Sequence, residues 1–303
     1  MIKKNKILVV LNMVKDSFDL YLKIQGEKTI SEKYEIYLLN STIIDTRKKA
    51  ILEICKDENR KVVIVSTQSV EAGVDIDFDV GFRAYAPFDS IVQVAGRINR
   101  NSSKECCEMF VFEDGTSKKV YKKDSKSIET NDDASIKSFF SKKFIDENSE
   151  IKEFYDRVIN GIDQKNKTLF IDSSQTNVSD IRNLFLRQVD RNVHLIEGDT
   201  ISLFIPYNED GEKLWLEYES LFDGEKCFEN AISIKEFKKQ LIPYSINIFN
   251  CYTKHGKLKE IIDEEIRYGF YYCENWSKYY NLETGLDQEE FKKSVGEREA
   301  LFV

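Results

Sequence analysis

The sequence predicts an α/β protein whose first 116 residues form a doubly wound parallel sheet, followed by a smaller α+β domain. The first observation is a series of short apolar runs, the pattern of strands that are buried on both faces of a parallel sheet. The second is that helical patterns separate these runs, as crossover connections between parallel strands require. The third is a change near residue 168, beyond which short apolar runs alternate with Asn, Asp and Gly turns.

Each element of the first domain has its own signal. Five strands are expected, at Ile7–Leu11, Tyr34–Leu39, Lys61–Ser66, Phe82–Ala86 and Cys107–Phe112. One helix is expected where Val14, Phe18, Tyr21 and Leu22 recur near 3.6-residue spacing, and another over Arg47–Cys55. This alternation of strands and helices indicates a doubly wound sheet.

A lysine-rich segment separates the two predicted domains. Ser117–Lys126 contains five lysines and one acidic residue, so we expect a linker or an exposed arm, with a helix from about Ile136 to Ile159. The predicted parts are therefore a sheet domain at 1–116, a linker and helix at 117–167, and an accessory domain at 168–303. The aromatic-rich stretch Tyr268–Tyr280 is compatible with base stacking or, more simply, with the accessory core.

Composition sets broad limits on function. The net charge of -8 argues against general nucleic-acid binding, which depends on Lys and Arg, but it leaves room for a local basic track. No stretch approaches the roughly 20 apolar residues that span a bilayer. The six cysteines form no C-x-x-C pair and only two histidines occur, so we expect a cytoplasmic protein with reduced thiols and no metal site built from its own residues.

The first chemical motif is Lys61–Phe78, in which a buried strand ends at Ser66-Thr67 and a Gly73-Val74-Asp75 turn follows. In an α/β sheet, ligands bind in the crevice at the carboxyl ends of the strands. Thr67 and Ser69 could donate to a phosphate there, and Asp75 could accept from a ribose hydroxyl. The alternative is a strand followed by an ordinary polar turn.

The second motif is Asp89–Arg100, which is expected to be one helix. At spacings i, i+4 and i+7, Gln93, Arg97 and Arg100 would share a face, and two arginines in fixed register can clamp a phosphate. The alternative is a solvated face on a helix that begins with a capping box formed by Ser90 and Gln93.

Taken together, the two motifs resemble motifs V and VI of superfamily 2 helicases, in which two RecA-like domains hold ATP between them. The matching patterns are Thr-x5-Gly-x-Asp and Gln-x-x-Gly-Arg-x-x-Arg. The resemblance implies that the sheet domain is the second RecA-like domain. It also implies roles for individual residues. Thr67 would contact the nucleic-acid backbone, Gly73 the nucleotide, Asp75 its ribose, and Gln93 the nucleotide or the facing domain. Arg97 and Arg100 would reach the γ-phosphate, with Arg100 the preferred arginine finger.

Within that superfamily the chain most resembles the helicase-nuclease of type I CRISPR systems. The resemblance rests on four stretches, Ile7–Tyr21, Thr67–Phe78, Ala86–Arg100 and Tyr279–Leu286. It implies ATP-driven movement along single-stranded DNA in antiviral interference, with a guide-RNA surveillance complex as partner. A looser match at Asn40-Ser41 and Arg47 implies that Ser41 and Arg47 contact the nucleic-acid backbone.

Equally informative are the motifs that the 303 residues lack. No G-x-x-x-x-G-K-[ST] pattern occurs, and Asp263-Glu264-Glu265 lies in a helix-like charged run rather than after a buried strand. Neither histidine is followed by Asp, as the family's nuclease domain requires. We therefore expect a fragment, a split product or a truncated homologue that is inactive alone. ATP and Mg²⁺ would be shared with a missing first motor domain.

Two other functions fit the same residues. One is the helicase half of a DNA repair or restriction enzyme. The other is a non-catalytic module that binds nucleic acid or the guide complex without any ATPase activity.

Overall fold

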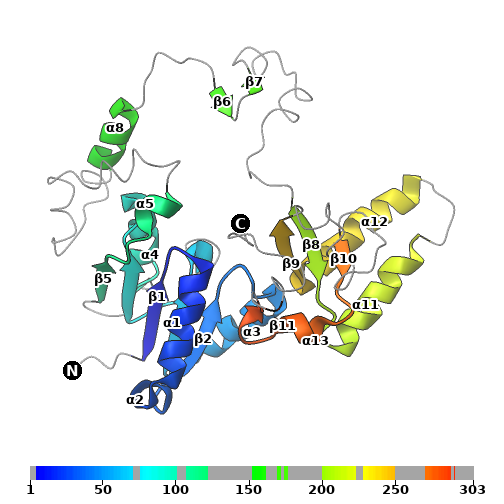
Figure 1. The fold of residues 1–303 in the computed structure, drawn as a ribbon, viewed down its shortest axis with the longest axis horizontal. Coiled ribbons are helices and arrows are strands. Elements are labelled where there is room, and N and C mark those ends of the chain that lie inside the picture. The colour runs from blue at the N-terminus through cyan, green and yellow to red at the C-terminus, as the bar shows by residue number, and fades with distance from the viewer. Residues whose placement is uncertain are drawn as a thin grey trace. The chain divides into compact units, whose positions relative to one another are not determined.

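The computed structural model describes residues 5–70, 76–100, 107–121, 152–161, 169–171, 174–176, 200–222, 228–249, 270–287 and 290. The chain divides into two units, residues 1–122 with 200–303 and residues 123–199, and Figure 1 labels described elements of each. Because linker residues 122–151 lie outside the described part, the domain boundaries expected near 116 and 167 remain predictions.

The core of the first unit is a five-stranded sheet in the order β2-β3-β1-β4-β5. Every pair in this sheet is parallel. Its strands are β1 Lys6–Val10, β2 Glu35–Leu39, β3 Val62–Ser66, β4 Val80–Ala84 and β5 Glu108–Phe112. These bounds confirm the five predicted strands, with shifts of up to two residues at the ends.

Helices pack on both faces of this sheet, which explains the continuous apolar runs. On β1, Leu8 and Val10 belong to one buried cluster, whereas Val9 belongs to another together with Leu11, the residue after the strand. The first cluster includes side chains of α3 Asp45–Lys56 and α4 Phe88–Ala95, and the second includes side chains of α1 Val14–Gly26. Shorter elements are α2 Lys28–Ser31, the 3-10 helix η1 Gln68–Val70 and α5 Ser117–Val120.

The C-terminal part of the first unit is built around a three-stranded sheet in the order β10-β8-β9. Its elements are β8 Thr200–Phe204, α11 Glu209–Ser220, α12 Phe228–Leu241, η4 Ile242–Tyr244, β9 Ser245–Phe249, β10 Phe270–Tyr272, α13 Trp276–Tyr279, β11 Tyr280–Asn281 and β12 Gly285–Leu286. This mixture is the predicted smaller α+β part. Phe270, Tyr271, Tyr279 and Tyr280 are all buried, so these aromatics form core rather than a base-stacking surface.

The second unit contains the described elements α8 Lys152–Gly161, β6 Leu169–Ile171 and β7 Ser174–Thr176, the last two paired antiparallel. In none of the described segments is a helix both long and apolar enough to cross a bilayer.

Candidate nucleotide and nucleic-acid site

The structure separates the described candidate residues of the sheet domain into two groups. Thr67, Ser41 and Arg47 follow the carboxyl ends of β3 and β2, where parallel α/β sheets bind ligands. Arg97 and Arg100 lie instead beside the segment that leads into β4. Gly73 and Asp75, at 71–75, lie outside the described residues.

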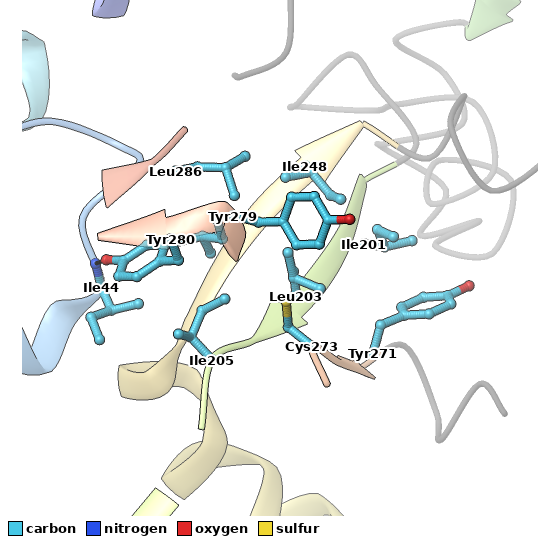
Figure 2. Close-up of a cluster of buried hydrophobic side chains, with 11 residues drawn as sticks. Ile44, Ile201, Leu203, Ile205, Ile248, Tyr271, Cys273, Tyr279, Tyr280 and Leu286 are labelled. Atoms are coloured by element: carbon cyan, nitrogen blue, oxygen red, sulfur yellow. Dashed lines mark hydrogen bonds between the residues drawn. The ribbon is translucent and has the colours of Figure 1, made fainter. Parts of the chain in front are cut away.

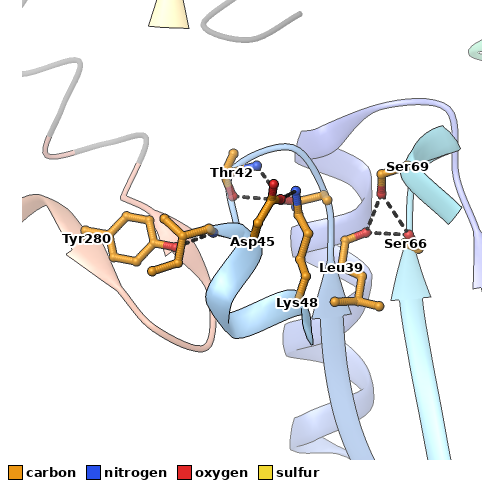
Figure 3. Close-up of polar contacts among 9 residues, drawn as sticks. Leu39, Thr42, Asp45, Lys48, Ser66, Ser69 and Tyr280 are labelled. Atoms are coloured by element: carbon orange, nitrogen blue, oxygen red, sulfur yellow. Dashed lines mark hydrogen bonds and ion pairs between the residues drawn. The ribbon is translucent and has the colours of Figure 1, made fainter. Parts of the chain in front are cut away.

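Serine hydroxyls at the end of β3 and just after it form hydrogen bonds to the last residue of β2 (Figure 3). Ser66 Oγ donates to the carbonyl oxygen of Leu39, and Ser69 Oγ donates to the same oxygen at 3.1 Å. The prediction that Ser69 donates to a phosphate is therefore wrong for this structure, because its hydroxyl is held by β2. Thr67, between them, is only 5% exposed and its carbonyl accepts from Ser66 Oγ at 3.2 Å.

The segment after β2 is also constrained from within. Asn40 is buried, and its Oδ1 accepts from the backbone N–H of Thr42 at 2.9 Å and from Thr42 Oγ1 at 2.7 Å. Its Nδ2 donates to Ser17 Oγ on α1 at 3.2 Å. In contrast, the buried Ser41 Oγ and Arg47 Nε have no hydrogen-bond partner among the described residues. Both residues are half-buried as a whole, although these two atoms are themselves shielded from solvent.

The second motif requires a correction. The sequence predicts one helix over Asp89–Arg100, but α4 ends at Ala95. Gln93 is therefore on the last helical turn, whereas Arg97 and Arg100 lie beyond it and do not share a helical face with Gln93. Nor does the predicted capping box form: the cap is Pro87, which makes no side-chain hydrogen bond, and Ser90 Oγ accepts from Arg83 Nη2 at 3.0 Å.

Long-range pairing explains why the helix stops. Phe78 forms a parallel bridge with Ile98: the Phe78 N–H donates to the Arg97 carbonyl at 3.1 Å, and the Asn99 N–H donates to the Phe78 carbonyl at 3.0 Å. Asn99 has a φ of 54°, the left-handed conformation that asparagine tolerates better than most residues. Gly81 on β4 leaves space for Ile98, because a Cβ there would lie 2.7 Å from Ile98 Cδ1. This pairing removes 97–100 from the helix.

The same pairing brings the two predicted motifs together. The backbone N–H of Arg100 donates to Asp77 Oδ1 at 2.9 Å, two residues after Asp75 in the sequence. Arg97 is half-buried and Arg100 is exposed. Two arginines are thus held on a short, hydrogen-bonded segment beside the end of the first motif. Such an arrangement can bind anionic oxygens.

A buried arginine network at the carboxyl edge was missed by sequence reasoning. Arg83 on β4 is fully buried; its Nη1 donates to Asn12 Oδ1 at 2.7 Å, and its Nη2 donates to Tyr121 OH at 3.0 Å. Tyr121 OH also accepts from Gln68 Nε2 at 2.9 Å. With Ser90, these contacts connect the residue after Thr67 to the first turn of α4. A lone arginine in a predicted strand carries no signal that would have identified it.

Among the described cysteines, Cys55, Cys107 and Cys273 are free, and burial raises the pKa of Cys55 and Cys273 to about 12. The described residues contain no group of three or more His, Cys, Asp or Glu side chains able to hold a metal.

The five-stranded parallel sheet with helices on both faces has the RecA-like α/β fold of helicase motor domains. Residues 3–103 match the family described as "CRISPR-associated nuclease/helicase Cas3, C-terminal". Residues 3–103 are therefore similar to a C-terminal part of this family's members.

Individual relatives agree with this assignment. The chain is 29% identical over 156 residues to a CRISPR-associated nuclease/helicase Cas3 of Methanothermobacter thermautotrophicus, covering 50% of this chain and 16% of the relative. It is 37% identical over 83 residues to the Cas3 of Haloferax volcanii, covering 26% and 9%. The chain thus matches less than a fifth of the length of either relative.

Solved structures share the fold. T. fusca Cas3 superposes with a TM-score of 0.53 at 13% identity, covering 89% of this chain and 36% of that one. T. fusca Cas3 with AMPPNP gives 0.52 at the same identity and coverage.

Proposed function

We propose that this chain is a C-terminal portion of an ATP-dependent, CRISPR-associated DNA helicase-nuclease that acts on single-stranded DNA in antiviral interference. Its sheet domain serves as the second motor domain. ATP and Mg²⁺ bind between this domain and a first motor domain that carries the P-loop. Because the 303 residues contain no P-loop pattern, the chain alone does not turn over ATP.

One observation carries this proposal: the joint between Asp77-Phe78 and the Arg97–Arg100 segment. Phosphoryl transfer depends on cations that are fixed in place before charge develops on the γ-phosphate. The joint fixes the backbone from which both arginines extend. In the proposal Arg100 is the arginine finger, Arg97 is the second phosphate ligand, and Gly73, Asp75 and Gln93 contact the nucleotide.

The other group of residues is proposed to contact DNA. Thr67, Ser41 and Arg47 follow the carboxyl ends of neighbouring strands β2 and β3, so one backbone can pass over all three. A hydroxyl and a guanidinium both donate to phosphate oxygens, and Ser41 and Arg47 are half-buried rather than enclosed, which supports this role. In the whole protein, a nuclease domain and a guide-RNA surveillance complex are the remaining partners, and the cytoplasm is the compartment.

A reconstitution assay tests the proposal. ATP turnover is measured for this chain, for a separately supplied first motor half that carries a P-loop, and for their mixture, each with and without single-stranded DNA. The expected result is background turnover for this chain and DNA-stimulated turnover for the mixture. Magnesium-dependent turnover by the pure chain would contradict the proposal. A mixture no faster than the first half alone, with DNA binding intact, would favour a non-catalytic binding module.

A further inference from the structure

A hairpin from the C-terminal part of the chain holds the loop that joins β2 to α3. The hairpin, Tyr280–Leu286, consists of β11 and β12, and we call it the clamp hairpin. The loop, Asn40–Ile44, is called the β2–α3 loop. It immediately precedes the helix that carries Arg47. Three separate contacts join the two segments, although more than 200 residues separate them in the sequence.

The first contact is a hydrogen bond. The backbone N–H of Ile44 donates to Tyr280 OH at 2.9 Å (Figure 3). Tyr280 is 3% exposed, and burial raises the pKa of its hydroxyl well above the ordinary value. Ile44 is the residue that precedes the first turn of α3, whose N–H has no partner within the helix. Tyr280 therefore supplies an acceptor that the helix itself cannot provide.

The second contact is a close backbone approach that requires glycine. Gly285 has a φ of +78°, a conformation that other residues adopt only with strain. A Cβ at this position would lie 2.1 Å from Thr42 Oγ1 and 2.8 Å from the Thr42 carbonyl oxygen. Thr42 cannot turn away easily, because Asn40 accepts from both its N–H and its hydroxyl.

The third contact is apolar. Ile44 is fully buried, and the other buried members of its cluster all lie between Ile201 and Leu286 (Figure 2). The sheet domain thus places one side chain into the accessory core. Because a hydrogen bond, a glycine contact and a buried isoleucine fall within three residues of the loop, the loop's conformation depends on the hairpin.

Arg47 also lies within the electrostatic reach of this hairpin. The pKa of Tyr21 is raised by burial and by the negative charge of Glu283, and it is lowered by the positive charge of Arg47. The charge of Arg47 likewise lowers the pKa of the Tyr280 hydroxyl, against the larger effect of burial. Arg47 and the hairpin therefore act on the same neighbourhood.

We infer that the clamp hairpin is a positioning element for nucleic-acid binding: it fixes the β2–α3 loop so that Ser41 and Arg47 meet a phosphate of single-stranded DNA. Tyr280 and Gly285 are the positioning residues, and they act through the loop without touching DNA. This inference rests on the proposed function, because it takes Ser41 and Arg47 as phosphate ligands. It adds that the accessory part controls a contact made by the motor domain.

The test measures binding of the full 303-residue chain to a fluorescein-labelled oligo-dT strand by anisotropy, over a series of salt concentrations. Tyr280→Phe and Gly285→Ala should each weaken binding about tenfold, the factor expected for one charge-assisted hydrogen bond. Each should also reduce the slope of log K against log salt by about 0.7, the value for one phosphate contact on a single strand. A general loss of stability in a protein that remains folded does not change this slope.

Matched controls separate the clamp from generic effects. Tyr37→Phe removes a hydroxyl that donates to Glu35 within the same strand. Gly115→Ala introduces Cβ at a φ of +76° with nothing within 4 Å, so it reproduces the backbone strain without the contact to Thr42. Both controls should bind oligo-dT with the affinity and salt slope of the unmodified chain.

A double-mutant cycle supplies the decisive comparison. If the hairpin acts through Arg47, Tyr280→Phe in an Arg47→Ala background should cause little further loss, whereas independent effects would multiply. Circular dichroism checks folding, and Tyr280→Phe alone carries the test if Gly285→Ala does not fold. The inference would be overturned if the folded variants bind oligo-dT with normal affinity and salt slope. It would also be overturned if the loss of affinity caused by Tyr280→Phe is as large in the Arg47→Ala background as in the unmodified chain. Absence of salt-dependent binding by the unmodified chain would overturn the proposed function itself.

Discussion

Truncating Ile44 measures how strongly the C-terminal part is anchored to the sheet domain. Ile44 is fully buried in the accessory core, so Ile44→Ala removes buried methyl and methylene groups and leaves a cavity. Such truncations cost about 2–5 kcal/mol, whereas Ile44→Val should cost about 0.5–1.5 kcal/mol. With a urea dependence of about 2 kcal/mol per molar, the alanine variant should lower the unfolding midpoint by about 1–2.5 M.

The chain contains a suitable internal probe for this measurement. Both of its tryptophans, Trp215 and Trp276, lie in the C-terminal part, and Trp276 packs against the cluster that contains Ile44. Urea unfolding followed by tryptophan fluorescence should therefore report the loss directly. Ile51→Ala makes the same truncation in the core of the sheet domain, so its loss of unfolding free energy is the reference for an ordinary core truncation. An Ile44→Ala midpoint equal to that of the unmodified chain would refute the anchoring.

Three further predictions follow from the described contacts. Arg83→Met roughly keeps the side-chain volume but removes the hydrogen bonds that the guanidinium donates to Asn12, Ser90 and Tyr121. Urea unfolding should show a loss of about 1–3 kcal/mol, and an unchanged midpoint would contradict the network. Burial raises the pKa of the Cys55 and Cys273 thiols to about 12, so the stability tied to their protonated forms is complete below about pH 9 and is lost as pH rises toward 12. Between pH 9 and pH 12 the free energy of unfolding should fall by about 1.4 kcal/mol per pH unit for each thiol. Alanine at both positions should make the free energy of unfolding depend less on pH in this range. Trypsin should cut first within Ser117–Asp133. The two products should co-elute in gel filtration, because residues 200–303 pack with residues 1–122. First cuts inside 170–300 would contradict the predicted boundary.

The strands of the sheet domain could be predicted because their signal is local. A run such as Val62–Ser66, buried along its whole length, reads as a parallel strand without knowledge of its neighbours. The end of α4 could not be predicted in this way. Gly96 is a weak stop signal, and the event that terminates the helix is the pairing of Ile98 with Phe78, twenty residues earlier.

Side-chain networks across the fold were beyond sequence reasoning for the same reason. Nothing in the sequence near Arg83 indicates its partners, because the acceptors Asn12 and Tyr121 lie 71 and 38 residues away. The same holds for Ile44, whose partner Tyr280 lies 236 residues away. The motif patterns selected the candidate residues. Only the fold separates Thr67 and Ser41 at the carboxyl edge from the Arg97–Arg100 segment beside the start of β4.

The central claim is that Arg97 and Arg100 complete an ATP site shared with a first motor domain. The most direct measurement is single-stranded-DNA-stimulated ATP turnover by the reconstituted pair of halves, comparing the unmodified chain with Arg100→Ala and Arg97→Ala. Removing the finger arginine should reduce turnover by about 10³–10⁵, with Arg100 giving the larger loss. If both variants remain folded and keep near-normal turnover, the assignment of this segment to the ATP site is wrong.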